Sequence, residues 1–233
     1  MPDPQVPHPS TSDYSEQMQA ARQFYRDVLL ALRGGSLPFL VGGAYAFARY
    51  TGIKRPTKDF DLFLRPDDFP AALRVLAAAG LDTEASFPHW LGKAGRGEHV
   101  VDIIFSSGNG VAKVDDGWFA HAVHGEVFAL PVPLIPPEEM LWSKAYVMER
   151  ERYDGADVMH LLHARGQLLD WPRLVARFGA DWELLLVHLL LYQYIYPGDP
   201  HPAPAFVYDD LFGRLATLLR QEPTRDRICR GTL

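Results

Sequence analysis

Residues 57–64, Thr-Lys-Asp-Phe-Asp-Leu-Phe-Leu, decide the fold because apolar and acidic side chains alternate along them. Phe60 and the two leucines fall on one side of an extended chain, and Asp59 and Asp61 fall on the other, which is the period of a β-strand. The stretch therefore predicts a strand that packs one face on the core and holds two carboxylates side by side. An Asp-x-Asp pair is also typical of a strand end in solvent, and this alternative stays open.

A glycine pair precedes this strand. Leu37–Val41 is short and apolar, as a buried strand is, and Gly42-Gly43 leads directly into a predicted helix over 44–50. Glycine lets the backbone approach a ligand closely, and the free N–H groups at a helix N-terminus favour phosphate. The pair thus indicates a phosphate-binding turn, although a simple tight turn has the same sequence.

A third acid lies further along the chain, in the apolar run from His99 to Phe105 that predicts another strand. Asp102 within this run requires an explanation, because burying an unpaired charge is costly. One explanation is a divalent cation shared with Asp59 and Asp61, since Mg²⁺ prefers oxygen ligands. The other is an ion pair with a lysine or arginine at the edge of the sheet.

The remaining sequence divides into an arm, a mixed half and a helical half. Residues 1–13 are rich in Pro, Ser and Asp and predict a flexible arm, residues 14–135 alternate helices and strands, and residues 136–233 predict mainly helices. The fold class is therefore α/β (α+β), a small mixed sheet flanked by helices with a C-terminal helical region. We interpret residues 92–97, Gly-Lys-Ala-Gly-Arg-Gly, as a turn whose two basic residues are weak candidates for binding phosphate.

The order of these motifs resembles the nucleotidyltransferase superfamily, whose fold is shared with DNA polymerase beta. A strand, Gly42-Gly43, a helix, the Asp59-x-Asp61 strand and Asp102 follow one another as in the toxin-like and antibiotic-modifying bacterial branches. The resemblance extends over about residues 37–165. Gly43 stands where many members have serine, which removes one hydroxyl contact to phosphate and leaves the substrate open.

The resemblance implies a set of roles for these residues. Gly42 and Gly43 would hold a nucleoside triphosphate such as ATP, Asp59 and Asp61 would ligate Mg²⁺ or Mn²⁺, and Asp102 would ligate the metal that activates the acceptor hydroxyl. The reaction would transfer a nucleoside monophosphate (NMP) to that hydroxyl and release pyrophosphate, driven by positioning and charge neutralisation.

Basic residues near these acids are further candidates. Lys58, with its neighbours Lys54 and Arg55, is predicted to neutralise phosphates, and a solvated basic loop is the alternative. The resemblance also implies that Lys144 points at the triphosphate. For the nearby Arg152, Asp154 and Asp157 we favour a structural ion network or a helix cap.

Composition limits the other possibilities. A net charge of -6 and a pI of about 5.8 disfavour broad nucleic-acid binding. The single cysteine, Cys229, excludes an intrachain disulfide and a cysteine-based metal site. We find no signal-like N-terminus and no apolar stretch of the roughly 20 residues that a membrane span requires, so we expect a cytoplasmic protein.

The sequence leaves the acceptor open among a small molecule, a protein hydroxyl and an RNA end. Two other functions also remain. One is the toxin of a toxin–antitoxin pair, with an antitoxin protein as partner and the same acidic site. The other is a catalytically silent domain that binds nucleotides or other proteins.

Overall fold

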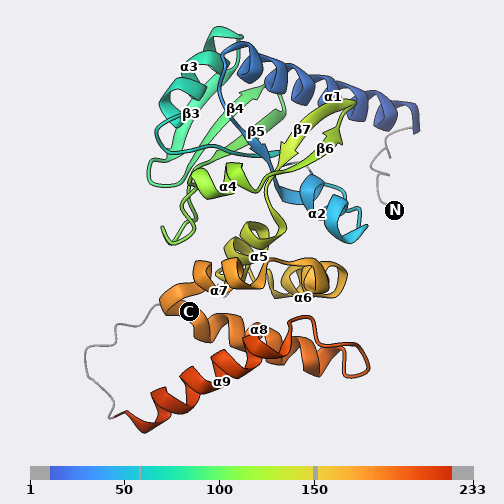
Figure 1. Ribbon diagram of the computed structural model, residues 1–233. Helices are drawn as coiled ribbons and strands as arrows, with labels where there is room; N and C mark the ends of the chain where they lie inside the picture. The colour runs from blue at the N-terminus through green and yellow to red at the C-terminus, as the bar shows by residue number, and fades with distance from the viewer. Residues whose placement is uncertain (1–10, 58, 149–151, 222–233) are drawn as a thin grey trace, which may run out of the picture.

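A seven-stranded mixed sheet forms the centre of the N-terminal half of the computed structural model, which describes residues 11–57, 59–148 and 152–221 (Figure 1). The strand order is β3-β4-β5-β2-β1-β7-β6. Two pairings, β2 with β5 and β1 with β7, are parallel, and the others are antiparallel. The strands are β1 Leu40–Val41, β2 Asp61–Phe63, β3 Asp82–Phe87, β4 Leu91–Arg96, β5 His99–Ile104, β6 Val123–Val127 and β7 Leu130–Leu134.

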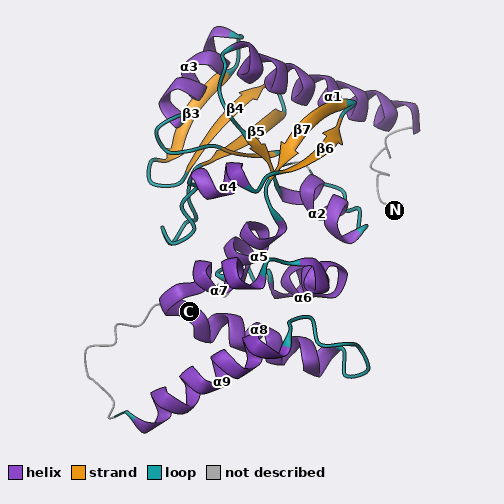
Figure 2. Cartoon of the chain, viewed as in Figure 1, coloured by secondary structure: helices purple, strands orange, loops and turns teal. Residues whose placement is uncertain are grey.

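Helices flank the sheet and make up the C-terminal half, as the purple ribbons of Figure 2 show. The N-terminal half contains α1 Thr11–Gly34, α2 Gly43–Thr51, α3 Phe69–Ala78 and α4 Asp116–Ala120. The C-terminal half contains α5 Pro137–Ala145, α6 Gly155–Arg165, η1 Gly166–Leu168, α7 Trp171–Phe178, η2 Gly179–Asp181, α8 Trp182–Ile195 and α9 Ala205–Arg220. The predicted α/β fold with a helical C-terminal region therefore matches the architecture observed.

One face of the sheet packs on the hydrophobic core. Phe60, Leu62 and Leu64 are fully buried on the same side as Val101 and Ile103 of β5, as their alternation predicts. Helices α1 and α3 cover this face (Figure 1). The opposite face carries the residues between these apolar ones, so the core on one side fixes which side chains point away from it.

Two segments differ from the prediction. Helix α1 begins at Thr11, so residues 11–13 belong to its first turn rather than to the arm. Residues 92–97 are not a turn, because Leu91–Arg96 forms β4 between β3 and β5. Glycine is needed at position 92 of this strand because a Cβ there would come within 2.6 Å of the Phe69 ring. The turn lies after the strand, at Gly97, whose φ is +63°.

The helical half contacts the N-terminal half at several points. Helix α6 packs against α2, and α5 follows directly after β7 and packs against α6 and α7. Across the described residues, the helices are too short or too polar to cross a membrane.

Candidate active site

The structure aligns Asp61 and Asp102 across two neighbouring parallel strands. The two residues are direct partners in the β2–β5 register, and the Asp102 N–H donates to the Phe60 carbonyl oxygen over 2.9 Å. Neighbouring strands lie about 4.8 Å apart, and aligned partners point to the same face of the sheet. Asp59 precedes Asp61 by two residues, just before β2, and its charge acts on Asp61. We call Asp59, Asp61 and Asp102 the acid cluster.

The charges of Asp102 and Asp59 act on the carboxylate of Asp61. Burial and then the charges of Asp102 and Asp59 together raise the pKa of Asp61 from 3.8 to about 6. Lys144 and Arg152 oppose this shift but do not cancel it. The Asp61 carboxylate is therefore under-compensated, which is the condition that a bound cation relieves.

The glycine pair is required by the side chains of β2. The Gly42 N–H donates to the Asp61 carbonyl oxygen over 3.0 Å and ties the start of α2 to this strand. A Cβ at Gly42 would lie 2.2 Å from the Phe63 ring, and one at Gly43 would lie 1.8 Å from Asp61 Oδ2. Gly43 also has a φ of +52°, which favours glycine. The pair thus brings the N-terminus of α2 against the Asp61 carboxylate.

Asp102 has a basic partner on the next strand. Lys93 of β4 pairs in register with Asp102, and its Nζ lies 2.9 Å from Asp102 Oδ1. Among the residues that the structure describes, no group of three acidic, histidine or cysteine side chains is placed so that it could hold a metal ion. The acid cluster nevertheless supplies the hard oxygen donors that Mg²⁺ or Mn²⁺ prefers, and the raised pKa of Asp61 marks charge that these cations would neutralise.

Lys144 lies in an ion network between α5 and α6. Its Nζ is 2.9 Å from Asp154 Oδ2 and 2.8 Å from Asp157 Oδ2. Arg152 pairs with Asp154, and Arg55 pairs with Asp157 over 2.6 Å. The acids that begin α6 thus form the ion network that we favoured, although Asp154 at the N-cap accepts no capping bond through its side chain. Lys144 acts on Asp61 through its charge, and its binding to phosphate stays a prediction.

The loop before β2 carries the remaining predicted residues. Asp59 is exposed, and its N–H donates to Thr57 Oγ1 over 3.1 Å. Lys58, predicted to bind the nucleotide, lies outside the described residues. Arg55 forms an ion pair with Asp157. This contact connects the loop to α6, which the sequence did not predict.

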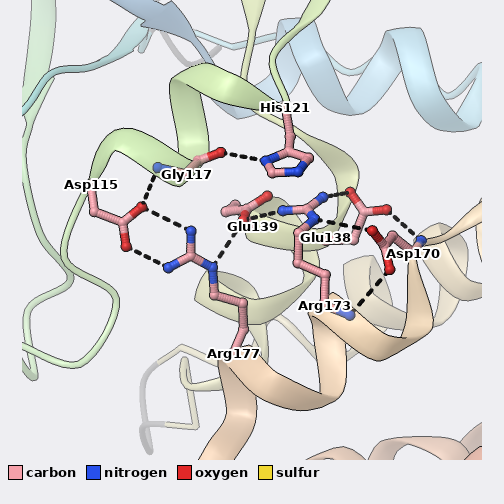
Figure 3. A network of polar contacts seen from close by, with 8 residues as sticks. All are labelled: Asp115, Gly117, His121, Glu138, Glu139, Asp170, Arg173 and Arg177. Carbon is pink, nitrogen blue, oxygen red and sulfur yellow. Dashed lines mark hydrogen bonds and ion pairs between the residues drawn. The ribbon is translucent and has the colours of Figure 1, made fainter.

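A second set of charges, the buried network, was not predicted as a unit. It joins the N-terminal half to α5 and α7 (Figure 3). Glu138 and Glu139 at the start of α5 are 5% and 0% exposed. They are the acidic residues in the first turn of α5. The network consists of Asp115, Glu138, Glu139, Arg173 and Arg177.

The contacts of the buried network satisfy nearly all of its charges. Arg173 pairs with Glu139 and, over 2.5 Å, with Glu138. Arg177 binds Asp115 through two bonds of 2.5 and 2.8 Å and donates to Glu139 over 3.1 Å. Arg173 and Arg177 are four residues apart and therefore share one helix face. This spacing was the one sign of the network in the sequence, and it does not identify which acids on other elements pair with the two arginines.

Comparisons with known proteins agree with the fold. The sequence matches neither a protein-family model nor a curated protein. The solution structure of the antibiotic-resistance factor ANT(2'')-Ia is similar with a TM-score of 0.52 and 16% identity, over 73% of this chain and 97% of that one. A crystal structure of ANT(2'')-Ia in complex with adenylyl-2''-tobramycin has a TM-score of 0.48, with 14% identity over 76% and 99% of the two chains.

The lincosamide antibiotic adenylyltransferase LnuA, with lincomycin bound, has a TM-score of 0.41 and 15% identity over 60% of this chain and 94% of its own. The match to the solution structure shows a shared fold. The predicted resemblance to nucleotidyltransferases is therefore confirmed at the level of the fold.

Proposed function

We propose that this chain is a metal-dependent nucleotidyltransferase that transfers an NMP from a nucleoside triphosphate to a hydroxyl acceptor. One observation carries the proposal: Asp61 and Asp102 are aligned on parallel strands, and the carboxylate of Asp61 lies against the N-terminus of α2. The arrangement combines acids suited to hard cations with a helix N-terminus, whose polarity suits phosphate. The fold shared with ANT(2'')-Ia supports the same assignment.

In this proposal, the residues of the acid cluster and the glycine pair have separate tasks. Asp59, Asp61 and Asp102 would hold Mg²⁺ or Mn²⁺, which would neutralise charge on the triphosphate. Gly43 would orient the phosphates through its backbone N–H group, whereas the N–H of Gly42 is bonded to the Asp61 carbonyl oxygen and Gly42 would serve by its lack of a side chain. Lys58 and Lys144 would be further cationic contacts. Holding both reactants in line and neutralising charge provides most of the catalysis in such transfers.

The chemistry is an in-line substitution at phosphorus. The acceptor oxygen forms a bond to the α-phosphorus, the bond from that phosphorus to the oxygen bridging to the β-phosphorus breaks, and pyrophosphate leaves. Asp102 would accept the proton of the acceptor hydroxyl. The acceptor is a hydroxyl compound, and an antitoxin partner stays a prediction from the sequence.

The test uses the full chain, each labelled nucleoside triphosphate and Mg²⁺, with mass analysis of the protein and of added hydroxyl acceptors. We expect an NMP adduct and pyrophosphate from the natural chain and none from Asp61→Asn. Asp67→Asn, which changes an exposed acid in a turn, is the matched control and should retain full transfer. Equal transfer by Asp61→Asn and the natural chain would refute the assignment.

A further inference from the structure

Four charged side chains form a row across the open face of the sheet. Glu84 of β3 pairs in register with Lys93 of β4, Lys93 pairs with Asp102 of β5, and Asp102 pairs with Asp61 of β2. Registered partners on adjacent strands point to the same face. A single lysine therefore lies between the acid cluster and a carboxylate outside it.

The two neighbours of Lys93 differ in environment. Asp102 is 18% exposed and binds the Lys93 ammonium directly, while Glu84 is exposed. Glu84 is the registered partner of Lys93 on the other side, so both acids lie within reach of its long side chain. The Lys93 side chain is 38% exposed, and its four-carbon stem has several rotatable bonds.

Stability does not account for this placement. A partly exposed lysine–carboxylate pair contributes about 0–1 kcal/mol to folding. The pair has a direct chemical consequence instead, because the ammonium neutralises one of the three carboxylates that would hold a cation. A divalent ion that binds Asp102 must compete with Lys93 for the same oxygen.

We propose that Lys93 is a positioning residue that controls access of a divalent cation to Asp102 by exchanging its bond to Asp102 for one to Glu84. The inference rests on the proposed function, because it takes Asp102 as a metal ligand. While Lys93 binds Asp102, the carboxylate is held in place and its charge is balanced. When Lys93 turns to Glu84, Asp102 is free to join Asp59 and Asp61 as a ligand.

The test is a calorimetric titration of Mn²⁺ into the full chain without nucleotide or acceptor. We expect Lys93→Met to bind Mn²⁺ roughly tenfold more tightly than the natural chain, because a competing positive charge has been removed. Glu84→Gln should bind Mn²⁺ several-fold more weakly, since Lys93 loses its alternative partner. Lys93→Arg, which keeps the charge, should restore the natural affinity, and Lys113→Met, an exposed loop lysine, should not change it.

Opposite effects of two neighbouring substitutions are not expected from a purely structural ion pair. Adding Asp102→Asn to Lys93→Met should abolish the gain in affinity, as a double-mutant cycle requires. Equal Mn²⁺ affinity in Lys93→Met and the natural chain, or a gain that survives Asp102→Asn, would overturn the inference. If Lys93→Met does not fold, the Glu84→Gln variant tests the inference on its own. An Mn²⁺ affinity of Glu84→Gln equal to that of the natural chain would then refute the exchange of partners.

The titration also separates this inference from the proposed function. Absence of Mn²⁺ binding in both the natural chain and Lys93→Met would refute the acid cluster as a metal site and the role of Lys93 with it. Metal binding that responds to Lys93 and Glu84 in a chain that transfers no nucleotide would support the role of Lys93 and refute the transfer reaction.

Discussion

The acid cluster and the buried network contain the same kinds of residue but balance them differently. In the buried network, Arg173 and Arg177 make bonds with all three carboxylates, and α4, α5 and α7 are held together as a result. In the acid cluster, Lys93 binds Asp102, while the pKa of Asp61 is raised to about 6 by burial and by its acidic neighbours. A compensated set of buried charges is structural, and an under-compensated set is a site that can accept a cation.

The buried network should give the largest effect on stability. Arg173→Met would leave Glu138 and Glu139 without their shared guanidinium, and removing one partner of a buried ion pair costs about 3–5 kcal/mol. The free energy of unfolding from urea titration measures this loss. Arg214→Met, which removes an exposed pair with Asp210, is the control and should change it by less than about 0.5 kcal/mol. A loss from Arg173→Met as small as the control's would show that the network does not hold α5 and α7 together.

The acid cluster should respond with the opposite sign. Asp61→Asn removes a carboxylate whose charged form the folded state disfavours, so we expect the free energy of unfolding at pH 7 to rise by about 2–3 kcal/mol. The same variant should lose transfer, so stability and activity change in opposite directions. Destabilisation by Asp61→Asn in the absence of Mg²⁺ would contradict an under-compensated site.

The pH dependence of stability sharpens the same comparison. The pKa of Asp61 in the folded chain is about 6, which is above its ordinary value of 3.8. Between pH 3.8 and about 6, Asp61 therefore keeps its proton in the folded chain and loses it in the unfolded chain. This group therefore makes the natural chain less stable as the pH rises from 3.8 to about 6. The advantage of Asp61→Asn should be small near pH 4, grow towards pH 6 and level off above it. Urea titrations at several pH values, without divalent metal, measure this curve, and a constant difference would exclude the raised pKa.

The sequence pointed to the strands that carry Asp61 and Asp102 but not to the buried network, and the reason is the range of the interactions. The alternation around Asp59 and Asp61 is local, and it fixes which face the carboxylates occupy. Asp102 stood out because its neighbours along the strand are apolar. Glu139 has no such local signal, since its burial depends on Arg173 and Arg177, which lie more than thirty residues away in the chain.

Glycines caused the clearest error. Gly92 and Gly95 suggested a turn, but they lie inside β4, where Gly92 makes room for the Phe69 ring. Local composition does not distinguish a glycine that turns the chain from one that lets another side chain approach. The same ambiguity applied to Gly42-Gly43, which we interpreted as a phosphate-binding turn. The structure adds a steric reason for the pair, because Phe63 and Asp61 occupy the space that Cβ atoms would take.

The smallest expected effect on stability, and a test of how the acid cluster is built, comes from Gly43→Ala. The left-handed backbone at this position should cost about 1–2 kcal/mol. Because the new Cβ overlaps Asp61 Oδ2, the carboxylate must move, and transfer should fall although all three acids are intact. Urea titration and the transfer assay measure the two losses.

Gly213→Ala is the matched control for this substitution. Gly213 lies within α9, where a Cβ meets nothing within 4 Å, so alanine there should stabilise the chain by about 0.5–1 kcal/mol and leave transfer unchanged. If Gly43→Ala loses stability but keeps full transfer, the position of the Asp61 carboxylate does not determine the rate. The role of Gly43 would then be confined to the turn, and the contrast between a structural network and a functional acid cluster would no longer extend to the glycine pair.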